Sequence, residues 1–252
     1  MTVYAVALSK GGSTKTTTAA EVIAELARRG RTVLGIDLDQ QGNLTRRLGI
    51  RDAGGVSAAA ADVLLAEATA QEAAVPAPSV PGVSVLVGTD ELADLDQRPE
   101  VITSLRDYLP TLVGEWDDVV IDTPPSLGLV TLSALAAADV VIASIACETE
   151  AYDQLARLED VIRQRIASRM RPGQRVHWII PTRYDGRRLL DREIVELLHE
   201  TRPGTVTTPI RETVQARDAY TNGQPVSIYA PGSGIATDYA AAIATVIANS
   251  AR

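Results

Sequence analysis

Lysine is almost absent from this chain, and phenylalanine and cysteine are equally scarce. Lys10 and Lys15 are the only lysines among 24 basic residues, phenylalanine does not occur, and Cys147 is the single cysteine. One cysteine excludes an internal disulfide, and no apolar run approaches the ~20 residues that cross a bilayer. The sequence therefore fits neither a disulfide-rich scaffold nor a membrane-spanning protein.

The charge balance is acidic, and the length is that of one large domain. A net charge of −8 and a pI near 4.9 exclude a surface that is basic throughout and leave room for a local basic patch only. Met1 leads directly into strand-like residues, and the last predicted helix, 235–248, has no Lys or Arg to face a membrane. We expect a single cytoplasmic domain over residues 1–252 that binds no membrane.

Runs of Val and Ile alternate with helical patterns from end to end. Strands are predicted over residues 3–8, 32–38, 83–87, 118–121, 140–145 and 176–181. Helices are predicted over residues 16–29, 99–112, 129–137, 152–168, 189–200 and 235–248. Apolar strands separated by helices indicate a doubly wound α/β fold whose mainly parallel sheet has helices on both faces. The Ala- and Pro-rich segment 73–81 is predicted to be an internal loop.

Both lysines lie in a glycine loop between the first strand and the first helix. A standard Walker A loop has Gly where this chain has Ser9 and Thr14, but Lys15 followed by Thr16 is retained. Backbone N–H groups at a helix start, together with a lysine, can hold phosphates, and a threonine hydroxyl there can ligate Mg²⁺. We expect a negative φ at the β-branched Thr14. The predicted nucleotide-binding residues of this loop are Lys10, Gly11, Gly12, Ser13, Thr14, Lys15, Thr16 and Thr17.

Carboxylates follow two of the predicted strands. Asp37 and Asp39 end the second strand, and Asp122 follows the strand 118–121 in the Walker B arrangement. Ligands of parallel sheets bind beyond the carboxyl ends of the strands, so Thr16, Asp39 and Asp122 are the predicted metal-binding residues. Asp39 is also predicted to order the attacking water, with Gln41 and Asn43 as sensors of the γ-phosphate. Polar strand ends that merely begin turns are the alternative.

The segments 9–17, 37–43 and 122–126 together resemble the three motifs of ParA-type (Soj-like) partition ATPases, in the deviant Walker A (ParA/MinD) group of P-loop NTPases. The resemblance implies an ATP- and Mg²⁺-dependent homodimer in which Lys10 reaches the partner's phosphates, Gly11 lies at the interface and Asp39 is essential for hydrolysis. It further implies slow ATPase activity stimulated by a ParB-like protein, non-specific DNA binding in the ATP state, a nucleoid location, and segregation of a plasmid or chromosome. Lys10, Lys15 and Asp39 are the expected catalytic residues.

This sequence departs from the family pattern in several places. Thr14 replaces the usual Gly, and Gln40 stands where many relatives have Pro, which makes turnover harder to predict than nucleotide binding. The phosphate loop begins at residue 9, so we expect no N-terminal operator-binding domain and no autorepression.

Arginines in the second half are the candidate DNA-binding residues. By the resemblance, the basic residues expected to meet DNA phosphates are Arg183, Arg187, Arg188 and Arg217. The residues also predicted to contact the nucleotide are Arg183, Pro209 and Arg211. Solvated arginines paired with the abundant Asp and Glu are the alternative for each of them.

Two other functions remain open on the sequence. A switch of the same fold could position a non-DNA cargo or a division component. A ligase that forms an acyl phosphate could use a related loop, and would then need a substrate pocket. His177, His199 and Cys147 are expected to be structural or solvated residues and not catalysts.

Overall fold

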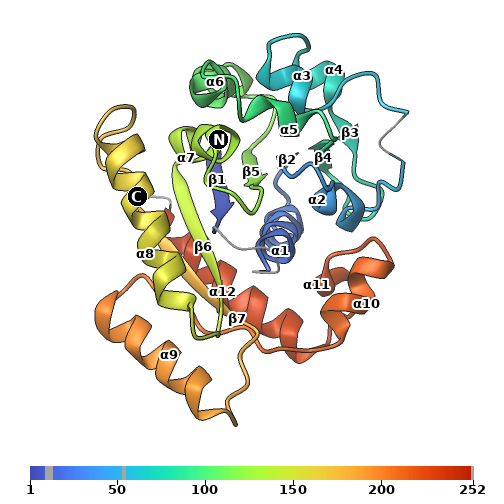
Figure 1. Ribbon diagram of the computed structural model, residues 1–252. Coiled ribbons are helices and arrows are strands. Elements are labelled where there is room, and N and C mark those ends of the chain that lie inside the picture. Colours follow the sequence, from blue (N-terminus) through green and yellow to red (C-terminus); the bar gives the residue numbers. More distant parts are fainter. Residues whose placement is uncertain (9–13, 53–54, 251–252) are drawn as a thin grey trace.

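A seven-stranded sheet forms the centre of the molecule in the computed structural model, which describes residues 1–8, 14–52 and 55–250 (Figure 1). Its order is β3-β4-β2-β5-β1-β6-β7. The strands are β1 (Thr2–Ala7), β2 (Val33–Asp37), β3 (Val75–Pro76), β4 (Val83–Leu86), β5 (Asp118–Asp122), β6 (Val140–Ala146) and β7 (Trp178–Thr182). All pairs are parallel except β3 with β4. The predicted doubly wound α/β fold is confirmed.

Helices cover both faces of this sheet. They are α1 (Lys15–Arg28), α2 (Asn43–Arg47), α3 (Ala60–Leu64), α4 (Ala70–Ala73), α5 (Leu92–Leu95), α6 (Val101–Tyr108), α7 (Leu129–Ala137), α8 (Ala151–Val161), α9 (Leu189–Thr201), α10 (Gln215–Thr221), α11 (Val226–Tyr229) and α12 (Gly234–Ser250). A 3₁₀ turn, Leu109–Leu112, continues α6, and a π-helical segment, Ile162–Ala167, continues α8. The predicted helices 99–112 and 152–168 are therefore each a composite of two helical types.

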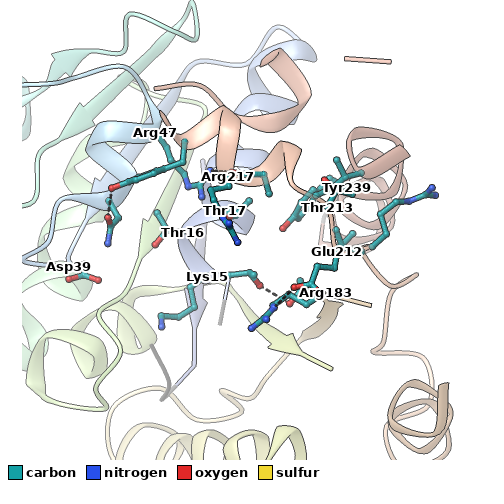
Figure 2. A pocket seen from close by; sticks show the side chains of 18 of the residues that line it. Lys15, Thr16, Thr17, Asp39, Arg47, Arg183, Glu212, Thr213, Arg217 and Tyr239 are labelled. Atoms are coloured by element: carbon teal, nitrogen blue, oxygen red, sulfur yellow. Dashed lines mark hydrogen bonds and ion pairs between the residues drawn. The ribbon is translucent and has the colours of Figure 1, made fainter. Parts of the chain in front are cut away.

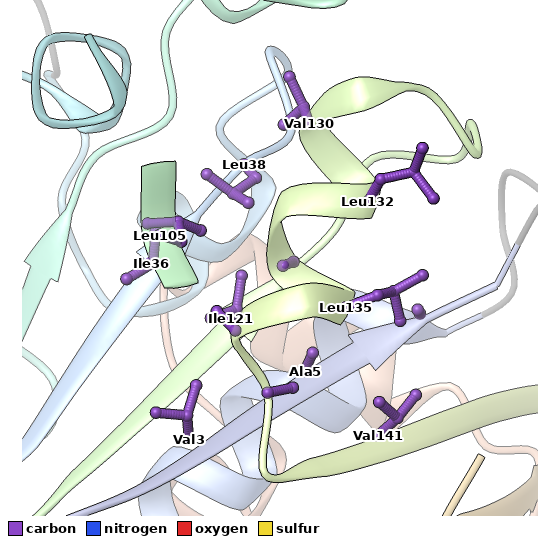
Figure 3. Packing of buried hydrophobic residues seen from close by; sticks show 14 of the residues in the cluster. Val3, Ala5, Ile36, Leu38, Leu105, Ile121, Val130, Leu132, Leu135 and Val141 are labelled. Carbon is purple, nitrogen blue, oxygen red and sulfur yellow. The ribbon is translucent and has the colours of Figure 1, made fainter. Parts of the chain in front are cut away.

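Alternation along the strands divides the core into two layers. Val3 and Ala5 of β1 pack on one face, which α6 and α7 cover through Leu105 and Leu135 (Figure 3). Tyr4 and Val6 point to the opposite face and join a second cluster that contains residues of α1 and α12. Because both faces are covered, the central strands are buried throughout, which explains their unbroken apolar sequence.

The predicted loop 73–81 is not a loop throughout. Val75 and Pro76 form the short edge strand β3, and Val75 pairs antiparallel with Val85. Proline lacks an N–H, and the edge of a sheet is where a strand tolerates that loss, so a proline-rich segment can still add a strand here. Sequence periodicity missed β3 because two residues show no alternation.

The connection after β1 lies at the end of the sheet where a ligand is expected to bind. β1 lies between β5 and β6, and the chain crosses from β1 through α1 to β2 on the far side of β5. The direction of winding thus reverses beside β1, the place where open α/β sheets bind ligands. Within the described ranges, no helix is long and apolar enough to cross a membrane.

Candidate nucleotide-binding site

The phosphate-loop lysine lies at the first turn of α1. Lys15 begins the helix and its side chain is buried, with 6% of its surface exposed. Burial lowers the pKa of Lys15, whereas the carboxylates of Asp122 and Asp39 act to raise it. The buried ammonium therefore faces acidic side chains at the ends of two neighbouring strands. The predictions for Lys10, Gly11, Gly12 and Ser13 lie outside the described residues.

Thr14 has a backbone conformation that is rare for its residue type. Its φ is 67° and its ψ is 10°, so the expected negative φ is wrong. The Thr14 hydroxyl donates to Thr182 Oγ1 at 2.6 Å and lies 3.0 Å from Ser144 Oγ. These contacts come from the ends of β6 and β7, and they offset the cost of left-handed backbone at a β-branched residue.

Asp37 is a buried carboxylate with several donors around it. It accepts hydrogen bonds from the Thr45 N–H at 2.8 Å, the Thr45 hydroxyl at 2.8 Å and the Asp39 N–H at 3.2 Å. Burial raises the pKa of Asp37 to about 6, although the Thr45 hydrogen bonds act in the opposite direction. Asp37 therefore anchors the start of α2 against the end of β2.

The environment of Asp122 differs from that of Asp37, which several donors surround. Its side chain is fully buried, and neither of its carboxylate oxygens has a hydrogen-bond partner in the described part of the chain. Burial and the nearby Asp37 raise the pKa of Asp122 to about 8, whereas Thr16 and Lys15 act to lower it. Buried polar atoms are almost always paired, so an unpaired carboxylate beside a phosphate loop fits a hydrated divalent cation.

The segment after β2 passes close to the end of β4. Asp39 is 8% exposed, and its Oδ1 accepts a hydrogen bond from the Gln41 N–H at 3.0 Å. A Cβ atom on Gly88 would lie 2.5 Å from the Asp39 carbonyl oxygen and 2.9 Å from Asp37 Cγ. Only glycine fits at position 88 without displacing this backbone, so the two segments are closely packed.

A cavity of about 600 Å³ opens above these residues (Figure 2). The predicted site residues that line it are Thr14, Lys15, Thr16, Thr17, Asp39, Gln41, Asn43, Arg183, Arg211 and Arg217. Asp122 is fully buried and does not line it, and Pro209, Arg187 and Arg188 line a second surface depression that shares Arg211 with the cavity. No group of three or more His, Cys, Asp and Glu side chains placed to hold a metal occurs in the ranges that the structure describes. Magnesium would therefore depend on Thr16, Asp122, phosphate oxygens and water.

Comparison with known proteins agrees with this geometry. A family model described as an AAA domain matches residues 1–172. The sporulation initiation inhibitor protein Soj of Bacillus subtilis is 31% identical over 252 residues, which cover 98% of this chain and 98% of that protein. The chain belongs to the ParA/Soj family of ATPases.

Two further proteins are similar to this ParA/Soj ATPase. The chromosome-partitioning ATPase Soj of Thermus thermophilus is 35% identical over 91% of this chain and 88% of its own length. The crystal structure of cobyrinic acid a,c-diamide synthase from Mycobacterium smegmatis, with a bound ATP analogue and magnesium, is 34% identical with a TM-score of 0.76. It matches 87% of this chain and 91% of its own.

The cavity of this ParA/Soj ATPase also contains side chains that sequence reasoning missed. The Arg47 guanidinium lies 4.9 Å from the centre of the Tyr220 ring, and its Nη1 donates to the Ala216 carbonyl at 3.4 Å. The Tyr220 hydroxyl donates to Asn43 Oδ1 at 2.8 Å. Burial lowers the pKa of Arg47, and it forms no ion pair with any carboxylate among the described residues. In the sequence, Arg47 is one arginine among many, and no motif separates it from the others.

The arginine face, defined as Arg183, Arg187, Arg188, Arg211 and Arg217, borders the cavity, and Arg183, Arg211 and Arg217 also line it. The closest ion pairs of its members join Arg183 to Glu148 at 2.6 Å, Arg187 to Asp185 at 2.8 Å, Arg188 to Glu212 at 3.7 Å and Arg211 to Asp238 at 2.6 Å. The hydrogen-bonded Arg187 side chain holds the pKa of Asp185 well below its usual range. Arg217 is exposed and lines the cavity. The face is thus largely neutralised by carboxylates of its own chain.

The remaining candidates have structural surroundings. His177 comes just before β7, and its Nδ1 accepts a hydrogen bond from the Val141 N–H at 3.0 Å, so it extends the contact between β6 and β7. Cys147 is buried, which raises its pKa to about 12. Neither side chain lines the cavity.

Proposed function

We propose that this chain is a slow, partner-stimulated, Mg²⁺-dependent ATPase switch. In this proposal it forms an ATP-sandwich homodimer at the nucleoid, binds DNA non-specifically in that state, and segregates a plasmid or chromosome with a ParB-like protein. The observation that carries it is the fully buried Asp122 carboxyl group, whose oxygens have no hydrogen-bond partner within the described chain and whose pKa the nearby Lys15 acts to lower. A cation bound beside Asp122 would favour its ionised form and give its oxygens a partner.

The chain's own residues would act mainly by positioning and charge neutralisation. Lys15 would contact the β- and γ-phosphates, Thr16 and Asp122 would hold Mg²⁺, and Asp39 would orient the attacking water. When bound, Mg²⁺ neutralises charge that develops on the transferred phosphoryl group. The position of Asp39 supports this assignment, because Asp39 lines the same cavity as Lys15 and Thr16.

The dimer and DNA parts of the proposal depend on other observations. Lys10 would reach the phosphates bound by the partner, and Gly11 would lie at the interface, as the family resemblance implies. Pairing two protomers would double the positive charge that meets a duplex, which suits an acidic chain in which Arg187, Arg188 and Arg211 line one surface depression. A single ParA-type ATPase domain over residues 1–252 would suffice for this activity.

The deciding experiment is DNA binding in defined nucleotide states. A duplex of arbitrary sequence would be titrated with wild-type protein in ATP, in ADP and without nucleotide, and then with Lys15→Ala. We expect tight binding by the wild type in ATP alone, and none by Lys15→Ala, because the ammonium that holds the phosphates is missing. Equal affinity in all states would refute the switch.

A second candidate is a ligase that activates a carboxylic acid through an acyl phosphate. The observation that favours it is the 34% identity with cobyrinic acid a,c-diamide synthase. ATP hydrolysis that requires a small carboxylic acid, and is not stimulated by DNA with a ParB-like protein, would support the ligase.

A third alternative is a switch of the same fold that positions a non-DNA cargo. It would show ATP-dependent dimerisation without DNA binding.

A further inference from the structure

Thr14 occupies a position at which the backbone favours glycine. Its φ of 67° lies in the left-handed region, where a β-branched side chain is strained. Such a conformation is strained and persists only where surrounding contacts impose it. The next residue is Lys15, the first residue of α1. The direction in which the chain enters the helix therefore depends on a strained residue.

The contacts that impose this conformation form a chain of hydroxyl groups. Thr14 donates to Thr182 at 2.6 Å, and its hydroxyl lies 3.0 Å from that of Ser144. The Ser144 hydroxyl lies 2.9 Å from that of Thr18, which lies 3.4 Å from the Tyr239 hydroxyl. The chain joins the phosphate loop to β6, β7, α1 and α12.

The Thr14 hydroxyl is the donor in its contact with Thr182, whereas either hydroxyl can donate in the contacts of Ser144 with Thr14 and with Thr18. Ser144 and Thr18 are fully buried, and Thr182 is 1% exposed where it lines the cavity. Removing the Thr14 hydroxyl would leave buried groups of β6 and β7 with one partner fewer.

We propose that Thr14 is a positioning residue, whose hydroxyl, held between Ser144 and Thr182, keeps the backbone of Thr14 in the left-handed conformation that nucleotide binding requires at the start of α1. Glycine reaches this conformation through its lack of a side chain, whereas Thr14 reaches it through hydrogen bonds. The inference rests on the proposed nucleotide function of the loop. It predicts that the hydroxyl of Thr14, and not its shape, sets the affinity for ATP.

The test compares dissociation constants for a fluorescent ATP analogue in the presence of Mg²⁺. Thr14→Val keeps the shape and the strain but lacks the hydroxyl, and we expect roughly tenfold weaker binding. Thr14→Ser keeps the hydroxyl and should restore affinity to within about threefold of wild type. Thr207→Val is the matched control, because Thr207 is also buried but donates to the Thr208 carbonyl, away from the site.

A double-mutant cycle tests the coupling with β7 even if Thr14→Val fails to fold. Thr182→Val should weaken ATP binding about fivefold in the wild type and leave it unchanged in the Thr14→Gly background, where no hydroxyl remains to pair. An equal cost of Thr182→Val in both backgrounds would overturn the inference, as would wild-type affinity in Thr14→Val. Absence of ATP binding by the wild type would instead refute the proposed function.

Discussion

The nucleotide cavity and the arginine face adjoin, yet their ionisable side chains differ in whether they have partners of opposite charge. In the cavity region, the buried Asp122 carboxyl group has no hydrogen-bond partner within the described chain, and the half-buried Arg47 forms no ion pair with a carboxylate there. On the arginine face, Arg183 and Arg187 are exposed and each is paired with a carboxylate of the same chain.

The cavity has groups that lack partners, as expected of a site that binds a ligand directly. The arginine face has ion pairs, which must break before its arginines can bind another molecule. An ionisable group that is removed from water and has no partner is costly to charge, so such groups at a cavity indicate that a ligand of the opposite charge completes them. Exposed pairs contribute little and exchange readily for phosphate contacts. We infer that nucleotide affinity is already present in one protomer, whereas DNA affinity depends on rearranging the pairs or on bringing two faces together.

The largest expected effect lies in the cavity, at the residue assigned to the attacking water. Asp39→Asn should lower ATP turnover by about a hundredfold or more, because an amide cannot accept or polarise the water proton in the same way. Binding of the ATP analogue should remain within a few fold of wild type. Phosphate release and equilibrium titration would measure the two quantities, and unchanged turnover would remove Asp39 from the hydrolytic step.

The next effect tests whether the unpaired guanidinium belongs to the nucleotide site. Arg47→Met retains most of the apolar contact with Tyr220 but lacks the charge, and we expect about tenfold weaker binding of the ATP analogue. Arg46→Met is the matched control, because Arg46 is the exposed neighbour on the same helix. Equal effects of the two substitutions would show that only the net charge of α2 matters.

A smaller effect, opposite in sign, should come from removing a carboxylate of the arginine face. Glu212 pairs with both Arg183 and Arg188. Glu212→Gln should strengthen ATP-dependent DNA binding about threefold at low salt, because Arg183 and Arg188 each lose one of their two carboxylate partners and one negative charge is removed beside them. Glu196→Gln, on the exposed side of α9, makes the same change in net charge and should have less effect. Weaker binding by Glu212→Gln would contradict the comparison.

The smallest expected effect is the loss of one exposed arginine. Arg187→Gln should weaken DNA binding by about twofold to threefold and reduce the slope of log affinity against log salt by about one. Arg163→Gln on the π-helical segment is the control, since Arg163 is also exposed and paired with a carboxylate, Asp160. An unchanged salt slope would place Arg187 outside the DNA contact.

Sequence patterns predicted the long elements well because each shows several periods. The predicted helix 129–137 coincides with α7, and the predicted strand 118–121 is β5 without its last residue. The four- and five-residue helices α2 to α5 were missed because one turn displays no apolar stripe. Tertiary contacts, which a single sequence does not display, form these short helices.

The site was predictable where it depends on the ends of long parallel strands. Lys15, Thr16 and Asp39 line one cavity because β1 and β2 end at the same edge of the sheet. Arg47 and Tyr220 were not predictable, since their contact joins two short helices that are far apart in the sequence. The predicted φ of Thr14 was wrong, because hydrogen bonds with residues of β6 and β7 outweigh the preference of a β-branched residue for negative φ.

The glycine at the end of β4 limits how the segment after β2 can move. A single added carbon at Gly88 would collide with the Asp39 carbonyl oxygen, so any other residue at this position would push the segment after β2 out of its present place. Because Asp39 lines the nucleotide cavity, the missing side chain at position 88 helps to determine where the Asp39 carboxylate lies.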